Sequence, residues 1–138
     1  MTMDEWIAAY DRKNPNDLFQ RDERFALFFQ PEHGFCEVMF TDEMTIINQL
    51  GGEALYWKDA VSHAAGMSGI HIGGTWCIRN NIVAYLRLFG YGIDHTEELK
   101  DGLERYYVIH KKTKKKGLAS PAFRYADGRQ AYFVTWEI

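Results

Sequence analysis

The sequence contains few of the residues that build metal sites or disulfide frameworks. Its 138 residues include only 2 cysteines, and neither belongs to a Cys-x-x-Cys motif or to a cysteine and histidine cluster. Zinc sites are built from such clusters, so no metal centre is expected. Cys36 and Cys77 lie inside apolar runs, which favours two reduced, buried thiols over a disulfide between them.

Long apolar runs and an excess of positive charge are also missing. No stretch of about 18 apolar residues occurs, so no membrane-spanning helix is expected. Residues 1–10 carry acidic side chains and do not resemble a signal peptide. The 16 Lys and Arg residues are outnumbered by 19 Asp and Glu residues, and the net charge of −3 disfavours nucleic acid or an anionic membrane as a partner. We expect a cytoplasmic protein.

Apolar residues are plentiful enough for a substantial core. Hydrophobic residues make up 46% of the chain and aromatic residues 15%, which is typical of a folded protein rather than a disordered one. The length is close to the commonest size of one domain, and no repeat or linker divides the chain. We therefore expect a single domain over residues 1–138.

Hydrophobic periodicity predicts two helices and a strand pair in the first half of the chain. Residues 4–12 and 53–65 have the spacing of amphipathic helices. Residues 25–30 and 35–40 are apolar runs on either side of a turn, which predicts a β-hairpin. Residues 45–47 fit either a further short strand or a packed loop.

A strand, a helix and two more strands are expected in the second half. Gly73 and Gly74 interrupt the first strand, which predicts a bulge or a close backbone approach. Asn80 or Asn81 is expected to cap the helix. The expected segments are strands over 70–78, 105–110 and 130–138, a helix over 82–89, a polar connection over 94–102 and a loop over 111–129. This order predicts an α/β (α+β) fold with a mixed, mostly antiparallel sheet flanked by helices.

One short motif opens the second expected helix. It reads Gln49-Leu50-Gly51-Gly52-Glu53-Ala54. Glycines let a backbone approach a pyrophosphate, and a helix N-terminus offers it free N–H groups. The motif resembles the Arg/Gln-x-x-Gly-x-Gly/Ala cofactor loop of the GNAT family of N-acetyltransferases. The alternative is a glycine pair that merely ends a loop.

A second segment carries the same resemblance. Residues 79–91 (Arg-Asn-Asn-Ile-Val-Ala-Tyr-Leu-Arg-Leu-Phe-Gly-Tyr) look like the GNAT stretch Asn-x-x-Ala-x-x-x-Tyr-x-x-x-Gly-Phe. With the elements around it, the resemblance covers roughly two thirds of the chain, residues 49–138. It implies a GNAT-like fold in which strand 70–78 lies parallel to the strand before Gln49. The chain is also similar to small GNAT-like proteins of tailed bacteriophages, some of which serve the virion or its assembly.

The resemblance implies acetyl-CoA as cofactor and an amine as acceptor. Acetyl transfer needs a base for the amine and a proton for the leaving thiolate. Glu37 interrupts an apolar strand and is the first candidate base, the alternative being an outward-facing strand residue. His71 is the second candidate, or else a structural histidine. Tyr85 is the candidate acid, and the alternative is a core residue. Alignment on Gly90 puts Leu86 at the position where GNAT enzymes often carry a tyrosine acid, and Tyr85 is one position away.

The remaining candidates concern binding. The resemblance adds Gly73 and Asn81 to the cofactor contacts of the Gln49–Ala54 motif. Residues 111–116 contain five lysines, which fit a solvated loop or a contact with the phosphates of nucleic acid or of coenzyme A.

Three functions follow from these candidates. They are an N-acetyltransferase, a catalytically silent module that binds phage structural proteins in head assembly, and a nucleic-acid-associated protein, which the acidic charge disfavours. A phage-encoded protein would act in the host cytoplasm or in the virion, and a homo-oligomer is compatible with each of the three.

Overall fold

The computed structural model describes residues 1–138 and contains three helices and eight strands. The chain divides into two compact units, residues 1–70 and 71–138, which are described here one at a time. None of the three helices combines the length and the apolar character that a membrane crossing requires. The expectation of mixed helices and strands is confirmed, while the expectation of one GNAT-like domain stays a prediction.

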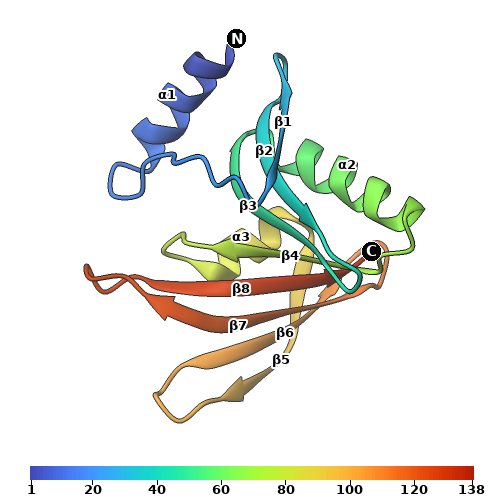
Figure 1. Cartoon of the computed structure of the whole chain (residues 1–138). Helices are drawn as coiled ribbons and strands as arrows, with labels where there is room; N and C mark the ends of the chain where they lie inside the picture. Colours follow the sequence, from blue (N-terminus) through green and yellow to red (C-terminus); the bar gives the residue numbers. More distant parts are fainter. The chain divides into compact units, whose positions relative to one another are not determined.

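The first unit is a three-stranded antiparallel sheet with two helices (Figure 1). The strands lie in the order β1-β2-β3, and Figure 1 shows α1 and α2 on opposite sides of them. Helix α1 begins with a capping box, in which Thr2 and Glu5 each bond the other's backbone N–H. The elements are α1 (Met3–Lys13), β1 (Ala26–Gln30), β2 (Gly34–Phe40), β3 (Thr45–Gly52) and α2 (Ala54–Met67).

Aromatic side chains fill one side of this unit. Phe35 on β2 is completely buried, with the rings of Tyr10 and Phe19 at 5.7 and 5.0 Å from its own. On α2, Trp57 and Val61 are buried as the helical spacing predicts. The open question about residues 45–47 is settled as strand, and β3 continues through Gly52.

The second unit is a five-stranded antiparallel sheet with one short helix. Its strands lie in the order β4-β8-β7-β6-β5. Asn81 caps the helix, as expected, by accepting a hydrogen bond from the backbone N–H of Ala84 at 3.0 Å. The elements are β4 (Ile72–Cys77), α3 (Ile82–Leu88), β5 (Tyr91–Glu98), β6 (Glu104–His110), β7 (Lys116–Arg124) and β8 (Gln130–Glu137).

Two segments that were expected from the sequence to be connections contain strands in the structure. The polar stretch 94–102 lies largely within β5, and the expected loop 111–129 contains β7. Strand β5 is an edge strand with mostly exposed side chains, so it does not need an apolar pattern. Strand β7 lies between β6 and β8, where backbone pairing on both sides holds a run of mostly small residues.

The bulge expected at Gly73 and Gly74 is wrong, and the group that approaches Gly73 is a side chain, not the backbone that the alternative predicted. The pairing of β4 with β8 runs without a shift from Ile72 to Cys77. A Cβ on Gly73 would lie closer than 3.0 Å to the indole ring of Trp136. The glycine therefore makes room for a tryptophan on the neighbouring strand. The expected parallel pair of strands joins different units and stays a prediction.

The expectation for the cysteines is confirmed, since Cys36 and Cys77 are free and buried. Burial raises the pKa of both thiols, and the nearby Glu37 carboxylate adds to the effect at Cys36. Because the thiolate is the reactive form, we expect neither cysteine to react with Ellman's reagent in the folded protein at pH 8. Both should react after unfolding in urea. Rapid release of thionitrobenzoate from the folded chain would contradict this placement.

Candidate functional site

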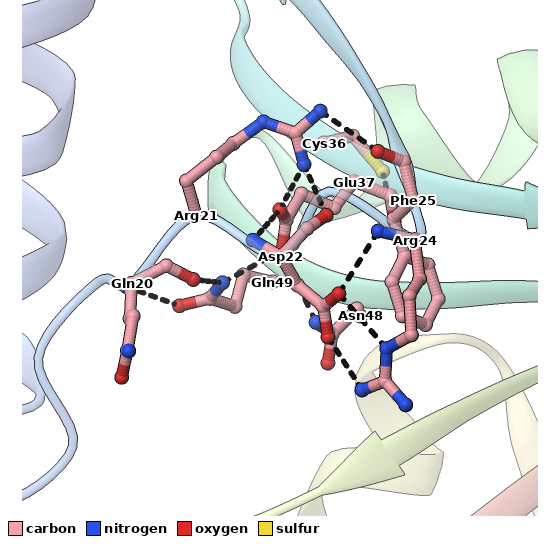
Figure 2. A network of polar contacts seen from close by, with 9 residues as sticks. All are labelled: Gln20, Arg21, Asp22, Arg24, Phe25, Cys36, Glu37, Asn48 and Gln49. Carbon is pink, nitrogen blue, oxygen red and sulfur yellow. Dashed lines mark hydrogen bonds and ion pairs between the residues drawn. The ribbon is translucent and has the colours of Figure 1, made fainter.

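Glu37 on β2 is completely buried and lies at the centre of a partly buried polar network in the first unit (Figure 2). Its Oε2 atom accepts hydrogen bonds from the Arg21 guanidinium at 2.7 Å and from the backbone N–H of Asp22 at 2.8 Å. Its Oε1 atom accepts from the side-chain amides of Asn48 at 3.1 Å and Gln49 at 2.6 Å. Four donors therefore occupy the roughly four acceptor positions of one carboxylate.

Arg21 extends this network to the segment before β1. Its guanidinium also donates to the carbonyl oxygens of Asp22 and Phe25, the latter at 2.8 Å. Asp22 in turn accepts from the Arg24 side chain at 2.6 and 3.0 Å, and these hydrogen bonds lower the pKa of Asp22 to about 2. Residues 21–25 have no regular secondary structure, so the network is what attaches them to the sheet.

These contacts bear directly on Glu37 as a catalytic base. A base needs a free lone pair within reach of the substrate. Glu37 is 0% exposed, and Arg21 holds an ion pair with it at 2.7 Å. The alternative of an outward-facing residue is wrong, because the side chain points into the unit. The geometry favours Glu37 as a structural anchor.

Gln49, the first residue of the expected cofactor motif, is a member of the same network. Its amide nitrogen donates to the backbone oxygen of Gln20 as well as to Glu37, and its amide oxygen accepts from the backbone N–H of Gln20 at 3.0 Å. Leu50, the next residue, pairs with Cys36 across the two strands. The motif therefore begins as strand.

The two glycines of the motif are also inside β3, so the expected loop is wrong in this part. A Cβ on Gly51 would lie closer than 3.0 Å to the ring of Phe35. Gly52 has a φ of +106°, and a Cβ there would lie equally close to the backbone oxygen of His33. Both positions need glycine because the neighbouring ring and carbonyl leave no room for a Cβ.

The helix start expected after the glycines is confirmed, because α2 begins at Ala54. Its N-cap residue is Glu53, whose carboxylate contacts the His33 imidazole at 3.0 Å. The His33 ring also stacks on Tyr56, with centroids 3.7 Å apart. A carboxylate at this helix end is stabilised by the helix dipole and would repel a pyrophosphate.

The other two catalytic candidates belong to the second unit. His71 is exposed and precedes β4 by one residue, and its carbonyl oxygen accepts the N–H of Ile138 at 2.8 Å. Tyr85 lies on α3 with its ring 5.0 Å from that of Phe89. Burial raises the pKa of Tyr85, which makes its hydroxyl a weaker proton donor. No direct contact connects His71 and Tyr85.

Of the residues expected to contact the cofactor, Asn81 borders a cavity. An open pocket of 590 Å³ lies in the second unit, beside the start of α3. Arg129, at its rim, donates to Asp127 at 2.8 Å and lies over the Tyr125 ring at 4.4 Å. The pocket is lined by Asn80, Asn81, Ile82, Val83, Tyr106, Asp127, Gly128, Arg129, Gln130 and Tyr132. Tyr106 comes from β6, Tyr132 from β8 and Arg129 from the turn before β8, and no sequence motif marks the three.

The lysine-rich segment forms an ordered turn between β6 and β7. The backbone N–H groups of Lys112 and Thr113 both donate to Nδ1 of His110 at 3.2 Å. His110 also bonds Lys114 and Lys115 through the backbone. The turn is thus held by its own backbone, and contact with nucleic acid stays a hypothesis.

Comparison with known proteins adds no assignment. No group of three or more histidine, cysteine, aspartate or glutamate side chains is arranged to hold a metal ion. The sequence matches no protein-family model, and no curated protein matches it either.

Proposed function

We propose that the chain is a catalytically silent, acetyltransferase-like module that acts by binding other proteins in an assembly. The observation that carries the proposal is the Glu37 network. The side chain that most resembles a catalytic base is completely buried and accepts four hydrogen bonds from its own chain. Substrate could reach it only if this network opened, at the cost of the ion pair with Arg21 and of the hydrogen bonds from Asn48 and Gln49.

The cofactor motif supports the same conclusion. The Gln49 amide is engaged by Gln20 and Glu37, and Gly51 and Gly52 are packed within the sheet. Glu53 places a negative charge where a pyrophosphate would need a positive environment. Residues that would serve acetyl-CoA in a GNAT enzyme thus support the fold here. The resemblance to phage-encoded relatives suggests that the assembly is a virion head.

An acetyl-CoA-dependent N-acetyltransferase is the second candidate. The starts of two helices favour it, because α2 begins two residues after Gly52 and α3 is capped by Asn81, as the resemblance requires. In that case Tyr85 would supply the proton to the thiolate.

A coupled assay of coenzyme A release separates the two functions. The purified chain is incubated with acetyl-CoA and a panel of primary amines, including polyamines and lysine peptides. We expect release at the rate of the protein-free control. Amine-dependent release that falls at least about tenfold in Tyr85→Phe would establish the transferase instead. Tyr85→Phe removes only a hydroxyl and should leave the fold unchanged. A fall in rate would therefore report the loss of the proton donor.

A further inference from the structure

The open pocket of the second unit is lined by both polar side chains and aromatic rings. Its volume of 590 Å³ falls within the range of about 300–1,000 Å³ that is usual for ligand sites. Asn81 comes from the start of α3, and Asp127 and Arg129 come from the turn before β8. Tyr106 on β6 and Tyr132 on β8 contribute rings whose centroids are 6.0 Å apart. Every one of these residues belongs to the second unit.

Three contacts hold the Arg129 guanidinium in place. Its Nε atom donates to Asp127 at 2.8 Å, its Nη1 atom donates to the carbonyl oxygen of Ile78 at 3.4 Å, and its Cζ atom lies 4.4 Å from the centre of the Tyr125 ring. Its Nη2 atom has no partner within the chain, and the side chain is 27% exposed. A guanidinium that is already oriented loses little conformational entropy when it binds a ligand.

The acceptors beside Arg129 are engaged, whereas donors are left over. Both oxygens of Asp127 accept hydrogen bonds from Arg129, one from its Nε atom and the other from its backbone N–H at 3.0 Å. The Oδ1 atom of Asn81 accepts the N–H of Ala84 as the cap of α3, so the amide N–H groups of Asn81 are the part that can bind a ligand. These two fixed groups, Nη2 of Arg129 and Nδ2 of Asn81, can only donate. A ligand that supplies oxygen acceptors satisfies both.

We propose that this pocket binds an organic monocarboxylate with an apolar stem. A carboxylate presents two acceptor oxygens, which suit the guanidinium and the amide. Asp127 offsets part of the positive charge of Arg129, which favours a singly charged carboxylate over a doubly charged phosphate. Tyr106, Tyr132 and Val83 also line the pocket and can contact the stem. The inference goes beyond the proposed function and does not rest on it.

Titration of the wild-type chain with 3-phenylpropionate, followed by two-dimensional NMR, tests the proposal. We expect saturable shifts of the backbone signals of residues 80–83 and 127–130, with a dissociation constant on the order of 1 mM because the probe has few atoms. The neutral 3-phenylpropanamide has nearly the same shape and should bind at least about tenfold more weakly. Absence of saturation up to about 20 mM, or equal affinity of the acid and the amide, would overturn the proposal.

Two variants test the donors. Asn81→Asp keeps a good helix cap but replaces the amide donor with a carboxylate, so it should weaken binding of 3-phenylpropionate at least about tenfold while the melting temperature is kept. Arg129→Gln should weaken binding by a similar factor. Arg105→Gln is the matched control, because Arg105 forms a 2.7 Å ion pair with Glu97 in the same unit, is 33% exposed and does not line the pocket. Equal affinities of the two arginine variants, or unchanged affinity of Asn81→Asp, would show that the carboxylate is not bound as described.

The carboxylate can come from a free acid or from the C-terminus of a partner protein. The tripeptide acetyl-glycyl-glycyl-phenylalanine, compared with its C-terminal amide, separates these two sources. An affinity at least about tenfold above that of 3-phenylpropionate, lost on amidation, assigns the pocket to a protein C-terminus. An affinity equal to or below that of 3-phenylpropionate assigns it to a free acid.

Discussion

Glu37→Ala should lower the free energy of unfolding by about 2–3 kcal/mol, because it removes a fully buried carboxylate that accepts four hydrogen bonds, while the Arg21 side chain, 37% exposed, stays solvated. The substitution leaves the Arg21 guanidinium and the amides of Asn48 and Gln49 without their acceptor. Residues 21–25 should then detach from the sheet, since Arg21 holds them there. Urea unfolding at pH 7, followed by circular dichroism, measures the loss.

Two variants separate this effect from a general cost of removing a carboxylate. Glu43→Ala changes an exposed glutamate and should stay within about 0.5 kcal/mol of the wild type. The double variant Glu37→Ala/Arg21→Ala should lose less than the sum of its single variants, because the two side chains share one interaction. Additive losses would mean that the ion pair does not stabilise the fold as described.

Gly52→Ala should cost about 3 kcal/mol or more, combining a strained positive φ with a steric clash. The φ of +106° is unfavourable for alanine, and the new Cβ would meet the His33 backbone oxygen closer than 3.0 Å. Gly69→Ala is the matched control, since Gly69 has a φ of +77° and no atom within 4 Å of a new Cβ. It should cost only about 1–2 kcal/mol.

Thermal unfolding of the two glycine variants side by side measures the clash alone. Equal losses would show that Gly52 has room for a side chain, as an open cofactor loop would.

Elements with a clear hydrophobic period were predictable from the sequence, whereas polar strands were not. Helix α2 shows its buried face in the spacing of apolar residues, strand β2 shows as a nearly continuous apolar run, and both are confirmed. Strands β5 and β7 are held by backbone pairing with neighbours far away in the sequence, and backbone pairing leaves no side-chain pattern. Their place in the sheet therefore could not be predicted locally.

Only the residues of the candidate site that break the local sequence pattern could be predicted, namely Glu37 and the glycines at 51 and 52. Glu37 stands out as a carboxylate within an apolar strand, but its partner Arg21 lies 16 residues earlier in a segment without periodicity. The glycines at 51 and 52 indicated a close approach of some group. A phosphate and a packed ring or carbonyl both require the same missing Cβ, so the sequence could not distinguish them.

Calorimetric titration of the wild-type chain with acetyl-CoA tests most directly whether the Glu37 network and the Gln49–Ala54 segment serve the fold rather than a cofactor. We expect no saturable heat of binding up to about 1 mM acetyl-CoA at pH 7. A one-to-one isotherm with a dissociation constant in the micromolar range, abolished by excess coenzyme A, would contradict the structural role assigned to these residues.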